Sequence, residues 1–243
     1  MRTSTTKIIL YIDKLGLGCI GEGMPSIREN VLKLLSEIPG GVQVVAAAKS
    51  MRIPEVLEAI EAGITMVGEN YLQESREVIG AIGAQVQWHF IGHVQKNKVK
   101  HVAGLFDMIE TVDSYELAAL VDEHARRLGK TMPVLIEVNS GREPQKAGVF
   151  PELVPQLIER LATLANIRVQ GLMTMGPFLD DPAGLRPYFR LTKELFDQVG
   201  GLGLAGVEMR HLSMGMSDSY HIAIEEGATL IRIGTQIFGP RPG

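Results

Sequence analysis

Short apolar runs rich in β-branched residues alternate with longer helical patterns along this chain, and this alternation is the strongest constraint on its fold. The runs are apolar on both faces, which is typical of a parallel sheet covered by helices. A further helix over residues 29–37 is expected before the first run. Eight strands are predicted, at Val42–Ala48, Thr65–Gly68, Val86–Ile91, Met108–Thr111, Pro133–Asn139, Val169–Thr174, Glu208–Met214 and Thr229–Ile233.

Eight strand–helix units in a chain of 243 residues predict an α/β fold, a single closed (β/α)8 barrel of the TIM type. An open, doubly wound sheet is the alternative architecture. The barrel is expected to occupy residues 24–243, because Met24 immediately precedes the first credible helix. Residues 1–23 match nothing in the barrel pattern and are interpreted as an N-terminal extension.

Charge and composition argue against several classes of protein. The net charge of −4 disfavours general nucleic-acid binding, which depends on basic surfaces. No apolar run approaches the length of a membrane span, and the N-terminus lacks the layout of a cleavable signal. The single cysteine, Cys19, cannot form an internal disulfide. We therefore expect a cytoplasmic protein without nucleic-acid or membrane partners.

Lys49 ends the first apolar run, at a place where lysine is unusual. In a barrel it lies just beyond the C-terminal end of the first strand, and barrel enzymes carry their chemistry at that end. A lysine that has simply reached solvent in a βα loop is the other interpretation.

The last two strands end in residues that suit a phosphate group. Ser217 precedes Asp218, where a helix is expected to open, so its hydroxyl can cap the helix or meet an anion. Arg232 lies inside an apolar strand and needs an acceptor there. Gly234 and Thr235 follow and can offer backbone N–H groups. Loops after the seventh and eighth barrel strands often form such a site.

The lysine and the phosphate site belong to neighbouring strands once a barrel closes. This arrangement fits a phosphorylated aldehyde held as a Schiff base, namely pyridoxal 5′-phosphate (PLP), with Lys49 as the amine.

Three other motifs lack the structural context that their function requires. Gly16–Gly21 reads G-x-G-x-x-G but is followed by another glycine and a proline, so no helix opens there. His89 and His93 are four residues apart, but the sequence around them predicts a strand and then a loop, which disfavours a zinc site. The basic stretch Lys96–His101 is interpreted as a solvated helix start.

Several stretches together, in this order, resemble one known family, the pyridoxal phosphate homeostasis proteins, which are single-domain relatives of the alanine racemase barrel. Two departures from the family pattern are Ala48 before the lysine and Ser219 after Asp218. The matching stretches are Val45–Lys49, Val67–Glu74, Trp88–Lys98, Glu137–Asn139, Lys146–Gly148, Gly171–Met175, His211–Asp218 and Arg232–Thr235.

The resemblance implies PLP on Lys49 and, by analogy with the racemases, Arg232 facing the pyridine nitrogen. It places Asn70 near the cofactor, with Met175 and His211 as weaker candidates. It also implies phosphate contacts, from Ser213, Ser217, Gly234 and Thr235.

The function implied by this resemblance is intracellular PLP homeostasis. Such a protein buffers the cofactor or delivers it to apo forms of PLP-dependent enzymes, as a monomer or weak dimer, without metal and without established catalysis. Two alternatives stay open: a weak PLP-dependent racemase or lyase, and a barrel that binds a phosphorylated sugar through an aldolase-type lysine.

Overall fold

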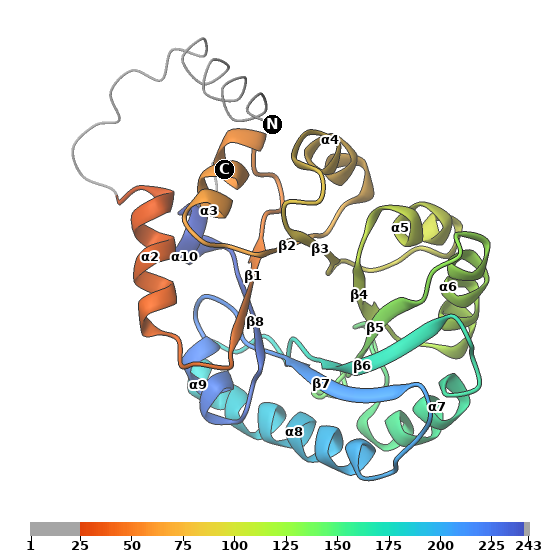
Figure 1. Ribbon diagram of the computed structural model, residues 1–243. Coiled ribbons are helices and arrows are strands. Elements are labelled where there is room, and N and C mark those ends of the chain that lie inside the picture. The colour runs from red at the N-terminus through yellow and green to blue at the C-terminus, as the bar shows by residue number, and fades with distance from the viewer. Residues whose placement is uncertain (1–24, 241–243) are drawn as a thin grey trace.

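The computed structural model describes residues 25–240, and eight parallel strands close into a barrel in sequence order (Figure 1). β1 pairs with β2 on one side and with β8 on the other, which confirms the closed (β/α)8 architecture. Each predicted strand is present, with bounds within two residues of the prediction. The strands are β1 (Gln43–Ala47), β2 (Met66–Glu69), β3 (Gln87–Phe90), β4 (Met108–Val112), β5 (Met132–Glu137), β6 (Ile167–Met173), β7 (Val207–Ser213) and β8 (Leu230–Ile233).

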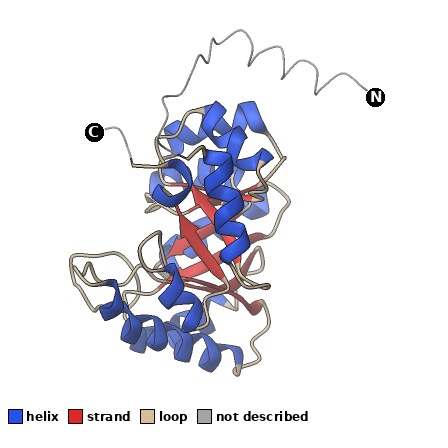
Figure 2. Cartoon of the chain, turned by 90° about the vertical axis from the view of Figure 1, so that its left-hand side faces the viewer, coloured by secondary structure: helices blue, strands red, loops and turns tan. Residues whose placement is uncertain are grey.

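Helices surround the strands on the outside, and Figure 2 shows the strands in the interior between them. The helix expected over residues 29–37 lies within α2, whose first turn is fixed by a capping box between Ser26 and Glu29. Ser114 is the N-cap residue before α6, and its side chain accepts the backbone N–H of Leu117. The helices are α2 (Ile27–Glu37), α3 (Ile53–Glu61), α4 (Leu72–Ile82), α5 (Val99–Leu105), α6 (Tyr115–Arg127), α7 (Val154–Leu161), α8 (Arg186–Gly200), α9 (Tyr220–Glu225) and α10 (Thr235–Phe238), with 3₁₀ turns η1 (Lys96–Lys98), η2 (Pro151–Leu153) and η3 (Pro182–Leu185).

The core has two parts, because successive strand residues point to opposite faces of the sheet. The larger part lies between the strands and the helices. The smaller part fills the inside of the barrel and is called here the inner apolar layer. It consists of Val45, Met66, Met108, Leu135, Met173 and Leu230.

The start of α9 differs from the sequence expectation. The helix expected to open at Asp218 begins two residues later, at Tyr220, with Ser219 in the N-cap position, so the predicted start is wrong. The expected extension over residues 1–23, with Gly16–Gly21 and Cys19, lies outside the described residues. Over residues 25–240, we find no helix of the length and apolar character that a bilayer crossing requires.

Candidate functional site

Lys49 lies at the mouth of the barrel, the end at which the C-terminal ends of the strands meet. It follows β1 by two residues, and its side chain is half-buried. Its Nζ lies 4.8 Å from the centroid of the Tyr71 ring, at the start of α4. Within residues 25–240, no carboxylate comes within 4.0 Å of this ammonium. The mouth therefore presents an amine held by a cation–π contact and not by an ion pair.

The turn after Lys49 has a strained backbone conformation, which a hydrogen bond helps to hold. Ser50 has a φ of +64°, which is rare for a residue with a side chain. Its backbone N–H donates to Oε2 of Glu74, on α4, over 3.3 Å. Such backbone conformations persist only where neighbouring groups hold them, and they concentrate at functional sites.

The loops after β7 and β8 meet beside the end of β1. Ser217 Oγ accepts the backbone N–H of Gln236 over 3.3 Å, which joins the two loops. A Cβ on Gly234 would lie 3.4 Å from the carbonyl oxygen of Ala47, so the backbones of β8 and β1 approach closely here. Thr235 is the first residue of α10, and its N–H has no acceptor within the helix. The structure thus brings Ser217, Gly234 and Thr235 together beside Ala47, which precedes Lys49 by two residues.

Asn70 directly follows β2 at the same mouth and is half-buried. A Cβ on Gly92 would lie 2.2 Å from the Asn70 carbonyl oxygen, so only glycine lets the loop after β3 pass. The carbonyl of Gly92 in turn accepts the Thr111 hydroxyl over 2.6 Å. The backbone at Asn70 is thereby fixed against β3 and β4.

A second layer inside the barrel is polar, and we call it the polar layer: His89, Glu110, Glu137, Ser213 and Arg232. Three of these residues follow members of the inner apolar layer by two positions, so strand alternation points them inward, one step nearer the mouth.

Four residues of the polar layer form a continuous chain of hydrogen bonds. Arg232 Nη1 donates to Ser213 Oγ over 2.6 Å, and Ser213 Oγ donates to Glu110 Oε2 over 2.7 Å. Glu110 Oε1 lies 2.7 Å from His89 Nδ1. All four side chains are buried, with exposed fractions between 0% and 5%. Arg232 Nη2 also donates to the carbonyl of Thr174 over 2.9 Å, so the acceptors that Arg232 needed are present.

The charged residues of the polar layer influence one another's pKa values. Burial opposes ionisation of Glu110, but His89, Arg232 and Ser213 outweigh it and hold the pKa of this carboxyl below its ordinary value. Burial lowers the pKa of the Arg232 guanidinium, and Glu110 and Glu137 act against that effect. Burial, reinforced by Asp113, raises the pKa of Glu137 to about 7, although Arg232 partly counteracts it.

Sequence reasoning missed Glu110, Glu137 and the role of His89. The available signal was the one that marked Arg232, namely a charged residue within an apolar strand, as in Ile109-Glu110. The structure also sets Ser213 apart from the other hydroxyl candidates, because its only proton is donated to Glu110. Ser213 is therefore a hydrogen-bonding partner of Arg232.

A cavity of about 290 Å³ opens at the mouth beside β5 and β6. Glu137 and Met175, the latter 49% exposed, are among its lining residues. His211, on β7, is half-buried; burial and the neighbouring His89 lower its pKa. The rest of the lining is Val138, Asn139, Ser140, Gly141, Lys146, Ala147 and Gly176.

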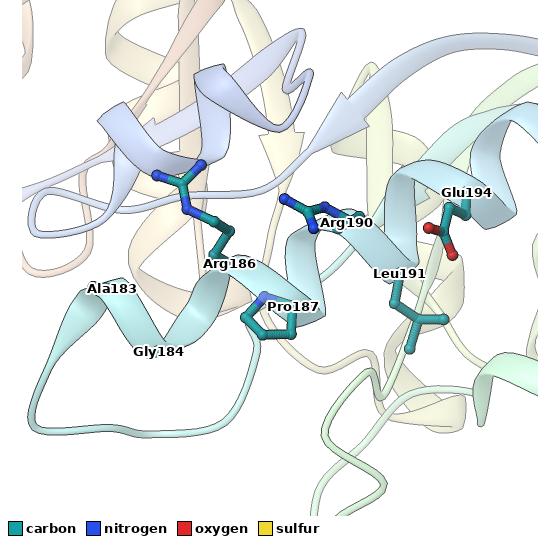
Figure 3. A pocket seen from close by; sticks show the side chains of 7 residues that line it. All are labelled: Ala183, Gly184, Arg186, Pro187, Arg190, Leu191 and Glu194. Carbon is teal, nitrogen blue, oxygen red and sulfur yellow. The ribbon is translucent and has the colours of Figure 1, made fainter.

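A wider depression of about 400 Å³ lies on the outside of the barrel, along η3 and α8 (Figure 3). Its two arginines are already paired. Arg186 donates to Glu225, the last residue of α9, and to Glu226, which follows it, and Arg190 donates to both carboxylate oxygens of Glu226 over 3.1 Å. These ion pairs hold α9 against α8 and leave the depression without an unpaired cation for a phosphate.

The histidines and lysines of the other motifs lie as the sequence indicates. His89 belongs to β3, whereas His93 is exposed in the following loop, so the two do not share a helical face. The stretch that begins at Lys96 forms η1 and the start of α5, with Lys96 exposed.

Known proteins resemble this chain over most of its length. The profile of the family described as alanine racemase, N-terminal domain, matches residues 24–242. The pyridoxal phosphate homeostasis protein of Aquifex aeolicus is 40% identical over 224 residues, 90% of this chain and 97% of the relative.

Solved structures agree with the sequence matches. PipY of Synechococcus elongatus, solved without and with PLP, has TM-scores of 0.83 and 0.82 at 31% identity, over 88% of this chain and 100% of PipY. Alanine racemase of Clostridium difficile has a TM-score of 0.72 at 17% identity, over 89% of this chain and 59% of the racemase, and shares the fold alone. The chain therefore belongs to the alanine racemase N-terminal domain family and, within it, to the pyridoxal phosphate homeostasis proteins.

Proposed function

We propose that this protein binds PLP at the barrel mouth and serves PLP homeostasis in the cytoplasm. It buffers the cofactor, delivers it to apo forms of PLP-dependent enzymes, and so influences amino-acid and keto-acid metabolism. The names of its relatives and the PLP-bound structure of PipY support this proposal. The observation that carries it is the position of Lys49, an amine that forms no ion pair with any described residue, beside the loops that hold Ser217 and Gly234.

The residues at the mouth suit the chemical groups of PLP. Bound PLP supplies an aldehyde, which forms a reversible Schiff base with a lysine amine, and a phosphate, which requires hydrogen-bond donors. Lys49 is the proposed amine. The Ser217 hydroxyl and the N–H groups of Gly234 and Thr235 are the proposed phosphate donors.

The remaining proposed contacts come from the walls of the mouth. Arg232 is assigned to the pyridine nitrogen, and Asn70 to the neighbourhood of the ring. Ser213 acts on the cofactor indirectly, because its hydroxyl accepts a hydrogen bond from the Arg232 guanidinium. A guanidinium keeps its proton at neutral pH, so Arg232 offers a fixed positive charge.

A carrier must release its cofactor, and a reversible link to Lys49 permits that. The test of this part is transfer: the PLP-loaded protein is mixed with an apo PLP-dependent enzyme, and recovery of that enzyme's activity is followed against free PLP. Assays for amino-acid racemisation and for lyase products, run with the same sample, distinguish the carrier from a weak enzyme. Turnover that disappears in Lys49→Ala would favour the enzyme.

The experiment that tests binding is an absorbance spectrum of the protein with PLP, before and after borohydride, with mass analysis of the peptide that contains residue 49. We expect a visible band that reduction converts to a pyridoxyl adduct on Lys49. Lys49→Ala is expected to lose the adduct and stay folded, because the side chain lies at the mouth and outside the core. Lys96→Ala, an exposed lysine after β3, is the control and should keep the adduct. A wild-type protein without a band at saturating PLP would overturn the proposal.

A further inference from the structure

We infer that Glu110 and His89 are positioning residues of the cofactor site, which hold Arg232 through Ser213 as an oriented cation with free donors toward the mouth. This inference rests on the proposed function, since PLP is the ligand that Arg232 would serve. Neither Glu110 nor His89 is expected to touch the cofactor.

The direction of each hydrogen bond follows from the inventory of donors. A guanidinium has only donors and an ionised carboxylate has only acceptors, so Ser213 must accept from Arg232 and donate to Glu110. The Ser213 hydroxyl has one proton, and Glu110 takes it. Glu110 therefore determines which lone pair of Ser213 faces Arg232 and fixes the guanidinium from β4, a strand that does not pair with β8.

The serine between the two charges occupies a single N–H group of Arg232. A direct bidentate pair with a carboxylate would occupy two N–H groups. Here one N–H goes to Ser213 and one to the Thr174 carbonyl. A guanidinium has five N–H donors, so three have no hydrogen-bond acceptor among the described residues. This arrangement would not stabilise a purely structural ion pair. Burying the separated charges of Arg232 and Glu110 costs free energy, and the inner apolar layer below them offers no polar partner.

His89 completes the chain from the opposite side. With Glu110 ionised, the short contact at Oε1 makes Nδ1 of His89 the donor. This bond satisfies the second carboxylate oxygen and leaves Glu110 without an unpartnered atom. The carboxylate is thus held at both oxygens, which fixes the geometry that Ser213 relays to Arg232.

Other titratable groups lie near these hydrogen-bonded residues, and their effects on Arg232 must be distinguished from that of Glu110. Glu137, on β5, interacts with Arg232, and Asp113 lies near Glu137. His211, on β7, interacts with His89 and Glu110. Glu137→Gln is therefore the control variant, because it removes a carboxylate that acts on Arg232 without a hydrogen bond to Ser213.

The test uses Glu110→Gln, Arg232→Gln and the double variant in the full-length protein, loaded with PLP. The readouts are the equilibrium affinity for PLP, the pH midpoint of the visible band and the thermal melting temperature. Removing the Arg232 cation should raise the pH midpoint, and removing the Glu110 anion should lower it, each by about one pH unit. The double variant should lie near the wild type, and Glu110→Gln should bind PLP about tenfold more weakly.

Two further variants keep the inference testable if Glu110→Gln fails to fold. Ser213→Ala deletes the bridging hydroxyl, and Ser213→Thr restores it. We expect the affinity and the midpoint to change in the first and to return in the second. Unchanged affinity and midpoint in Ser213→Ala or Glu110→Gln, with only a lower melting temperature, would mean a purely structural network and overturn the inference. Absence of the band in the wild type would overturn the proposed function as well.

Discussion

Glu69, the last residue of β2, is a carboxylate without a hydrogen-bonding partner for one of its oxygens. It is 1% exposed, and its Oε2 has no partner among the described residues. Met66 belongs to the inner apolar layer, so strand alternation points Glu69 outward, between the sheet and the helices. Burial and the nearby Glu74 raise the pKa of Glu69 to about 7.

This raised pKa predicts how stability depends on pH. Between about pH 4.5 and pH 7 the folded protein keeps the Glu69 proton while the unfolded chain releases it, so the free energy of unfolding falls as the pH rises. The corresponding loss is about 3 kcal/mol. Glu69→Gln mimics the protonated acid and should be more stable than the wild type at pH 8 but similar at pH 5. Urea denaturation at both pH values measures this.

Glu77→Gln, at an exposed glutamate of α4, is the matched control and should change neither midpoint appreciably. A Glu69→Gln protein that is less stable than the wild type at pH 8 would contradict the prediction. Some slope with pH is expected to survive in Glu69→Gln, because Glu137 also has its pKa raised to about 7.

Residue type and strand position were enough to select part of the candidate site. Lys49 and Arg232 are charged residues in or next to apolar runs, and Gly234 follows a strand, so each could be identified from the sequence. The link from Arg232 to Glu110 could not be identified in this way. It crosses the inside of the barrel between strands that do not pair, and no local pattern encodes which inward residues meet there.

At the scale of elements, the pairing of β6 with β7 depends on one glycine. Gly171 has a φ of +149°, and a Cβ there would lie 1.8 Å from the carbonyl oxygen of His211. The register of the two strands shifts next to this point, between Val169 and Gly171. The shift sets the partners that follow, including the bond from the Thr174 N–H to the Ser213 carbonyl. Gly171 thus aligns two residues that serve Arg232.

Gly171→Ala is therefore expected to destabilise the fold by more than about 3 kcal/mol, because the new methyl group meets backbone that cannot move away cheaply. Gly104→Ala, in α5, is the control: a Cβ there has no neighbour within 4 Å. Alanine in a helix should stabilise it by about 0.5–1 kcal/mol. Chemical denaturation of both variants gives the comparison, and equal stabilities would contradict the prediction.

Strands and the longer helices were predictable because their periodicity is local, but the start of α9 was not. Ser217 lies before a helical pattern and reads as its cap. In the structure its hydroxyl instead accepts an N–H from Gln236, a contact across 19 positions of sequence. Ser219 is the residue next to the helix, and its hydroxyl accepts the N–H of Met216.

At the scale of the whole molecule, the first and last described elements close the barrel together. β1 pairs with β8, and Asn30 of α2 donates to the carbonyl of Ile237 in α10 over 3.0 Å. Figure 1 shows α2 and α10 side by side next to these strands. Under the proposed function the cofactor joins the same two ends, through Lys49 and the loop after β8.

Binding should accordingly stabilise the closed barrel. At free PLP about a hundredfold above its dissociation constant, the free energy of unfolding should rise by about 3 kcal/mol. Thermal melting with increasing PLP measures this, and pyridoxal, which lacks the phosphate, should shift the melting temperature less. An equal shift with both compounds would argue against a phosphate site at Gly234 and Thr235.

The meeting of β1 with β8 also has a consequence for protein synthesis. Lys49 leaves the ribosome early, whereas Ser217, Arg232, Gly234 and Thr235 follow only after most of the barrel has been translated. A nascent chain therefore carries the proposed Schiff-base amine long before it can form the proposed phosphate-binding loops. Under the proposed function, the PLP aldehyde can therefore be bound only when translation is nearly complete, so that bound cofactor indicates a chain in which β1 and β8 have met.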